Sequence, residues 1–300
     1  MSCSQSAPVA ACVRIADMDT FDIEAYVERS RALDLTGIDW DAIPRHRLPP
    51  EAVRTLRYMQ DIESHTIIYL RTLLSTRAID DPAIAAFLAC WVYEETSHGR
   101  ALTRFLHAAG YTTVDRPTRS RVPLAAALRG RATQLLARAW PDFVAVHMTW
   151  GAINELTTYV GYQRLVEVAG HPVLAELLAR IMRDELRHFS FYYHEAEKRL
   201  RRPTTARVAR ALVDRFWAPV GSAEQPLAET RFLARYLLSG PDGRAAARRI
   251  DDKIRRLPGF TGAALVEAWM DRVPGEAPSM PVATYRALEP PALARPHAAR

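Results

Sequence analysis

The chain has 300 residues, of which 49% are hydrophobic and 25% are charged, as expected for a globular protein with a sizeable core. No apolar run reaches the ~18 residues that a membrane span requires, and the N-terminus lacks the basic start and apolar segment of a secretory signal, so we expect a cytoplasmic protein without a membrane span. The 3 cysteines have no paired spacing, which argues against a zinc ribbon, and the net charge of +6 comes from arginines interleaved with acidic residues, which argues against nucleic-acid binding.

The N-terminal part, residues 1–49, is predicted to be an extension of the main domain. Residues 1–19 are expected to be loosely attached, and a short helix is expected within residues 20–33. Pro50 is well placed to start a helix. From Pro50 onward the apolar residues recur at helical spacing, with no strand-like alternation.

Four long helices are predicted within residues 50–200, at about 51–75, 82–108, 141–168 and 172–200. The connection from 110 to 141, with a possible helix at 123–139, is long enough to run the length of a bundle. One long crossover between two antiparallel helix pairs is typical of ferritin-like bundles. We therefore predict an all-α fold, a ferritin-like four-helix bundle with additional C-terminal helices.

Residues 201–272 are predicted to form this C-terminal helical extension, and residues 273–300 a Pro- and Ala-rich tail. The expected helical segments lie near 204–218, 226–239, 243–257 and 261–271. The extension is rich in arginine, namely Arg201, Arg202, Arg207, Arg210, Arg248, Arg249, Arg255 and Arg256. These arginines form either a docking face for an acidic partner or ordinary solvated helix faces.

The apolar stripe of the second predicted helix is interrupted by two polar residues. Leu88 and Trp91 lead into Glu95 and His98, which are three residues apart and therefore lie on one helix face. Burying an unpaired carboxylate costs several kcal/mol. A glutamate on this face is therefore expected to be paired, protonated or bound to a metal.

The same unit occurs on the fourth predicted helix. Leu178 and Ile181 lead into Glu185 and His188, again three residues apart on the apolar stripe. Two Glu-x-x-His units on the buried faces of two helices are typical of a paired metal site.

Two further glutamates face the predicted core, Glu63 on the first helix and Glu155 on the third. Glu63 and Glu95 are equally far in sequence from residue 79, the centre of the turn between their helices. Glu155 and Glu185 are likewise equally far from residue 170, the centre of the turn between theirs. At ~1.5 Å of rise per residue, the paired glutamates lie at the same height. We therefore predict a dinuclear site with the ligands Glu63, Glu95, His98, Glu155, Glu185 and His188. Two iron ions are expected, although manganese or an iron–manganese pair would use the same ligands.

Several neighbouring residues leave alternatives open. Asp61 and His65 lie beside Glu63, but the stripe favours Glu63. Glu94 lies about 100° around the helix from the next residue, so we interpret it as solvated or as part of an interhelical ion pair. Asp184 either hydrogen-bonds a ligand histidine or forms a surface ion pair.

Three motifs resemble those of the soluble acyl-carrier-protein desaturases, a branch of the ferritin-like di-iron superfamily. They are Trp91-x-x-Glu94-Glu95-x-x-His98-Gly99, Glu155-x-x-Thr158 and Asp184-Glu185-x-Arg187-His188. The clear similarity covers about residues 50–200. It implies that the six predicted ligands hold iron, that Thr158 lies beside the oxygen-binding face, and that Asp184 is linked to electron delivery. Trp40 is a candidate for the family's surface tryptophan on the electron route.

The resemblance further implies an O2-dependent oxidoreductase that introduces a cis double bond into an acyl chain held by acyl carrier protein. The implied partners are a ferredoxin-type electron donor and a second copy of the chain in a homodimer. A narrow apolar channel is expected, with Gly151, Thr158 and Gly161 as candidate lining residues.

Three other functions stay open at this level. A di-iron hydroxylase or N-oxygenase of a biosynthetic pathway would use the same metal site, although related N-oxygenases carry an additional histidine where this chain has Ile181. Iron storage is disfavoured by the roughly 100 residues that follow the fourth helix. A structural polar network without metal is disfavoured by the complete ligand set.

Overall fold

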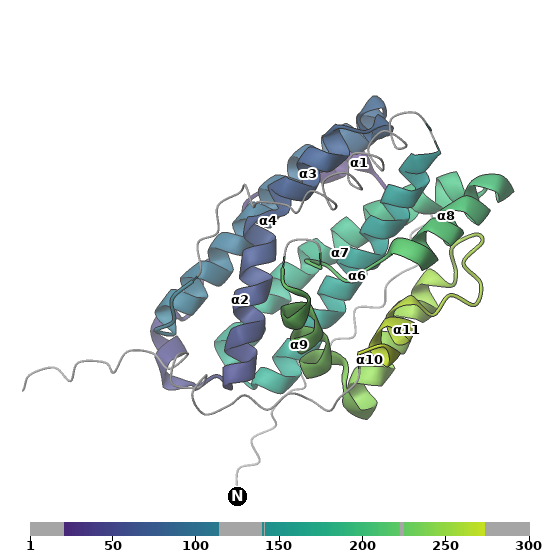
Figure 1. Cartoon of the computed structure of the whole chain (residues 1–300). Helices are drawn as coiled ribbons and strands as arrows, with labels where there is room; N and C mark the ends of the chain where they lie inside the picture. Colours follow the sequence, from purple (N-terminus) through teal and green to yellow (C-terminus); the bar gives the residue numbers. More distant parts are fainter. Residues whose placement is uncertain (1–20, 114–139, 141, 223–224, 274–300) are drawn as a thin grey trace, which may run out of the picture.

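The computed structural model describes residues 21–113, 140, 142–222 and 225–273 (Figure 1). Regular structure in these ranges is entirely helical, which confirms the predicted all-α class. The predicted loose segment 1–19, the possible helix at 123–139 and nearly all of the predicted tail lie outside the described residues.

Four long helices form the bundle at the centre of the molecule: α2 (Pro50–Ser64), α4 (Pro82–Ala108), α6 (Phe143–Ala169) and α7 (Pro172–Leu200). Helix α2 packs along α4, and α6 packs along α7 (Figure 1). Contacts of α4 with α7 and of α2 with α6 join the two pairs. This is the ferritin-like arrangement that the sequence predicts.

Local chemistry fixes the turns within each pair. Helix α4 begins at Pro82, where the Asp81 carboxylate accepts a hydrogen bond from the backbone N–H of Ala83. Helix α6 ends at Ala169 and is capped by Gly170, whose φ of 60° is the left-handed conformation that glycine adopts readily. Helix α7 then begins at Pro172. Because these capping residues determine where each turn lies in the sequence, they also determine the register of each helix pair.

The first predicted helix, at about 51–75, is divided into α2 and α3 (Thr66–Leu74), so the prediction of one continuous helix is wrong. At the break, the side chains of Ser64, His65 and Thr66 each bond to the carbonyl four residues earlier. Such bonds compete with the helical hydrogen bonds of the backbone. Helix α4 comes very close here, since a Cβ on Gly99 would lie 2.6 Å from the Ser64 hydroxyl oxygen.

Shorter elements cover the outside of α4: α1 (Ile23–Arg29), the 3-10 helix η1 (Trp40–Arg45), α3, and the 3-10 helix η2 (Arg77–Asp80). Helix α1 lies within the predicted range 20–33. It brings the buried Tyr26 against the bundle.

The C-terminal helices are α8 (Pro203–Phe216), α9 (Leu227–Leu238), α10 (Gly240–Ile254) and α11 (Leu265–Asp271). Three of them, α8, α9 and α10, contact α6 (Figure 1). Helix α6 is therefore covered on two sides, which explains why its buried residues occur all around it rather than along one stripe. The predicted domain boundaries near residues 49, 200 and 272 stay predictions.

None of the helices in the described part of the chain is long and apolar enough to cross a membrane.

We predict that Gly151→Ala on α6 destabilises the protein, because the added Cβ would lie 2.3 Å from the ring of Tyr192. Overpacking of this kind costs about 1–3 kcal/mol in the free energy of unfolding, which denaturant titration measures. Gly161→Ala on the same helix is the control. Its nearest neighbour would be Met59 Cε at 3.5 Å, and alanine favours the helix, so this variant should be neutral or stabilised. Equal effects of the two substitutions would contradict the packing described here.

Candidate metal centre

The structure brings all six predicted ligands together at the centre of the bundle. Each of the four long helices contributes, and each of the six residues has an exposed fraction of 7% or less. The residues are Glu63 on α2, Glu95 and His98 on α4, Glu155 on α6, and Glu185 and His188 on α7. The paired glutamates therefore meet, as their equal distances from the two turns predict.

The six residues form two overlapping groups that share Glu95 and Glu185. One group adds Glu63 and His98, the other adds Glu155 and His188, and the potential ligand atoms of each group lie within 4.8 Å of one another. His98 Nδ1 lies 3.5 Å from an oxygen of Glu63 and 3.3 Å from one of Glu185. His188 Nδ1 lies 3.1 Å from Glu95 and 3.7 Å from Glu155. This is the arrangement of two adjacent cation sites joined by two carboxylates.

The polar atoms at the centre of the cluster are buried without a hydrogen-bond partner among the described residues. They are Glu63 Oε2, Glu95 Oε1, His98 Nδ1, Glu185 Oε1 and His188 Nδ1. A buried polar group without a partner costs about 1–3 kcal/mol, and more if it is charged. Five such atoms converging from three helices fit metal ions, because carboxylate oxygen and imidazole nitrogen are the ligands that iron and manganese take.

Burial and like charge shift the pKa values of the cluster. The pKa of Glu95 lies well above its usual range because the side chain is buried and faces other carboxylates. Burial also raises the pKa of Glu155 to about 8. Burial alone would lower the pKa of His98, but the hydrogen bond to Asp184 and the negative charge of the nearby cluster carboxylates outweigh it and raise that pKa. In the absence of cations the cluster therefore retains protons that metal ions would displace.

The outer nitrogen of each histidine is held by a carboxylate. His98 Nε2 lies 3.1 Å from Asp184, and His188 Nε2 lies 2.8 Å from Glu94. Such contacts fix the ring orientation and direct both Nδ1 atoms into the cluster. For Asp184, the predicted hydrogen bond to a histidine is confirmed, and the residue is buried as well.

Comparison with known proteins supports the same chemistry. A sequence model of the fatty acid desaturase family matches residues 65–215, just over half of the chain. The chain belongs to the fatty acid desaturase family. This confirms the predicted resemblance to the acyl-carrier-protein desaturases of the ferritin-like di-iron superfamily. No curated protein and no solved structure gave a significant match.

The family match and the geometry support different parts of the site. The matched range includes five of the six predicted ligands, whereas Glu63 lies two residues before it. The choice of Glu63 over Asp61 and His65 therefore depends on geometry. Asp61 bonds instead to Gln225, and His65 lies at a cavity beside the cluster.

Sequence reasoning underestimated Glu94. The predicted interhelical ion pair exists, with Arg187 of α7 at 3.1 Å, but Glu94 is fully buried and also holds His188. The hydroxyl of Tyr26 on α1 donates a hydrogen bond of 2.8 Å to the same carboxylate. Burial would raise the pKa of Glu94, but His188, Arg187 and Tyr26 outweigh it and lower that pKa to about 2. No spacing rule signals Tyr26, which lies 68 residues from Glu94 in sequence.

Two further side chains position the carboxylates. The hydroxyl of Tyr162 donates a short hydrogen bond to Glu63, and the hydroxyl of Thr66 donates one of 3.3 Å to Glu95. Tyr162 lies on the same apolar stripe of α6 as Glu155, so the sequence predicts that its side chain faces the core. The sequence does not predict its hydrogen bond to Glu63.

Trp40 lies away from the cluster. Its ring packs under the guanidinium of Arg104, at 3.9 Å, six residues beyond His98 on α4. The assignment of Trp40 as the surface tryptophan on the electron route stays a prediction.

A cavity of about 180 Å³ adjoins the cluster. All four cluster glutamates line it, together with the aromatic side chains of Tyr69, Trp91 and Trp150. The predicted lining residues Gly151 and Thr158 are confirmed, whereas Gly161 does not line the cavity, and a Cβ added to it would meet Met59 and Leu237. The segment 218–222 forms a further wall. The lining is not purely apolar, because His65 and Asn154 also contribute to it.

We predict that the thermal stability of the metal-free protein falls as pH rises from about 5 to about 8. The pKa of Glu155 is about 8 in the folded protein and 4.5 as its ordinary value, so the folded state binds this proton more tightly. That stabilisation is complete below pH 4.5 and is lost as pH rises through 8. Glu185, whose pKa the two histidines lower to about 2 against the effect of burial, titrates below this window.

Calorimetry on chelator-treated protein should show a fall in melting temperature of more than about 5 °C across this range. Saturation with a divalent metal should abolish the fall. A melting temperature that rises or stays constant in the metal-free protein would contradict the proposed charge balance.

We also predict that Glu94→Ala weakens metal binding by about 10- to 100-fold, because it leaves His188 Nε2 without its carboxylate. Titration with Co(II), followed by calorimetry, measures the effect. Glu176→Ala on α7 is the control, since Glu176 is exposed and forms an ion pair with Arg180. Equal metal affinities for the two variants would show that Glu94 does not support the site.

Proposed function

We propose that this member of the desaturase family is an O2-dependent di-iron oxidoreductase that introduces a double bond into an acyl chain carried by an acyl carrier protein. The observation that carries the proposal is the pair of overlapping four-residue groups, which share Glu95 and Glu185 and border a cavity. The family match supports an oxidoreductase, and the carrier-bound substrate is our proposal.

In this proposal, Glu63 and His98 would hold one iron ion and Glu155 and His188 would hold the other, while Glu95 and Glu185, which belong to both groups, would contribute to both. When bound, the iron pair supplies the capacity to use O2 for the removal of hydrogen from an unactivated C–H bond. The chain itself positions the acyl group in the cavity and keeps water from the reaction. Manganese in one position is compatible with the same ligands.

Two further residues have proposed roles. Thr158 lies one turn after Glu155 on α6 and lines the cavity, so we assign it to the face where O2 and substrate meet. Asp184 contacts His98 and forms an ion pair of 2.9 Å with Arg187, whose side chain is 40% exposed. Arg187 also contacts Glu94. This chain from the surface to both histidines is our candidate for electron entry from a ferredoxin-type donor.

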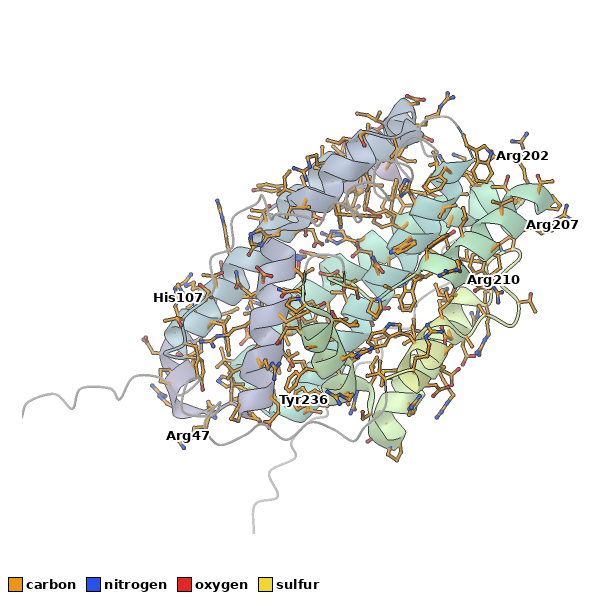
Figure 2. The ribbon with its side chains drawn as sticks, viewed as in Figure 1. Arg47, His107, Arg202, Arg207, Arg210 and Tyr236 are labelled. Atoms are coloured by element: carbon orange, nitrogen blue, oxygen red, sulfur yellow. The ribbon has the colours of Figure 1, made fainter. Side chains whose placement is uncertain are left out.

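The carrier protein is proposed to dock on the arginine-rich C-terminal helices. Figure 2 shows Arg202, directly before α8, and Arg207, on α8, projecting outward. Eight arginines of the C-terminal extension were named above as a candidate docking face. Arg210 and Arg255 are partly buried and pair with acidic neighbours, and the other six are exposed. An exposed basic surface favours an acidic carrier. A homodimer and a cytoplasmic location remain proposals from the family resemblance.

A di-iron oxygenase is the second candidate, and the polar residues His65 and Asn154 in the cavity lining favour it. A hydroxylase or N-oxygenase would accept a more polar substrate than a bare alkyl chain. The two activities differ in product mass, because desaturation removes two hydrogen atoms and oxygenation adds one oxygen atom.

The test is anaerobic reconstitution with Fe(II), followed by exposure to O2 with a reductant and a panel of acyl carriers. We expect product to form only with O2, with a mass lower by two hydrogens. Glu95→Gln, which removes a shared carboxylate, should lower the rate by at least about 100-fold. Glu176→Gln is the matched control and should retain activity. A product that gains oxygen would establish the second candidate instead, and full activity in Glu95→Gln would contradict both.

A further inference from the structure

One polar side chain in the cavity wall is held in a defined orientation. Asn154 of α6 lines the cavity directly before Glu155, and its amide oxygen accepts a hydrogen bond of 3.3 Å from the indole N–H of Trp217. Trp217 is buried and follows the end of α8. Trp217 lies outside the range 65–215 that matches the desaturase family, whereas Asn154 lies within it, so the family match covers only one partner of this contact.

The donor determines which way the amide faces. An indole nitrogen can only donate a hydrogen bond, so the Asn154 oxygen must face Trp217 and the NH2 group must face away from it. Within the described residues the structure shows no hydrogen bond from that NH2 group, and Asn154 is half-buried. Trp217 itself does not line the cavity, whereas Asn154 does. The amide nitrogen is therefore the polar atom that Asn154 offers to the cavity.

The wall around this amide is fixed by several contacts. The Tyr58 hydroxyl donates a hydrogen bond of 2.5 Å to the carbonyl of Val220, and Gly221 adopts a φ of 81° against the same tyrosine. A Cβ on Gly221 would lie 2.3 Å from the Tyr58 oxygen. The segment 218–222 is thus held against α2. The part of the cavity wall formed by residues 218–222 is therefore fixed in place and is not a free loop.

We propose that the Asn154 amide is a substrate-binding donor, and that the preferred substrate carries an oxygen acceptor near the carbon that reacts. This inference rests on the proposed function and narrows its substrate class to oxygenated acyl groups, such as oxo- or hydroxyacyl chains. A plain saturated chain would enclose the NH2 group without an acceptor. Thr158, one turn further along α6, lies beside it in the same wall.

The test uses the iron-loaded protein and small thioester probes, namely octanoyl N-acetylcysteamine and its 3-oxo, 5-oxo and 7-oxo forms. Calorimetric titration should show at least one oxo probe binding roughly tenfold or more tightly than the unsubstituted probe. Asn154→Asp should abolish that preference. Aspartate still accepts the Trp217 hydrogen bond but loses the donor, so the wall should keep its structure.

Gln163→Glu is the matched control, since it makes the same chemical change on α6 outside the cavity lining. It should retain the preference, and all variants should keep the wild-type melting temperature. Trp217→Phe, which frees the amide to turn, should give a partial loss.

Binding of every probe with equal affinity, binding of none, or an unchanged preference in Asn154→Asp would overturn the inference. Iron content measured on the same samples separates this from failure of the proposed function. Two irons per chain with no probe preference rejects only the substrate class, whereas protein that holds no iron rejects the function itself.

Discussion

Four carboxylates share one buried space at the centre of the bundle, and their mutual repulsion must be offset by positive charge or by protons. The raised pKa values of Glu95 and Glu155 express this constraint in the absence of cations. Two divalent cations would balance the four negative charges, with both histidines neutral as ligands. The rest of the architecture can be understood as the means of holding these six side chains in place.

Each helix pair contributes three of these six side chains. The turns at Pro82 and Gly170 fix the register, so that the glutamates of each pair meet at one height. Around them, Asp184 and Glu94 orient the histidines, and Tyr162 holds Glu63. Helix α1 contributes through Tyr26, so the N-terminal part of the chain is tied to the site as well. The cluster is thus supported from elements that lie far apart in the sequence.

The sequence predicted the helices and the six meeting residues because both follow local rules. Helical spacing places Glu95 with His98 and Glu185 with His188, and proline and glycine mark the turns. The break at His65 was missed because three side chains bond to backbone carbonyls there, which periodicity does not register. Tyr26, Trp217 and the wall at 218–222 were missed because their contacts bridge long stretches of sequence.

The central claim is that the cluster holds two metal ions between α2, α4, α6 and α7. Anomalous X-ray scattering at the iron absorption edge, from crystals grown anaerobically with Fe(II), tests it most directly. We expect two anomalous peaks, both flanked by Glu95 and Glu185, one beside His98 and the other beside His188. A map without peaks at these residues, or with iron bound only elsewhere on the chain, would contradict it.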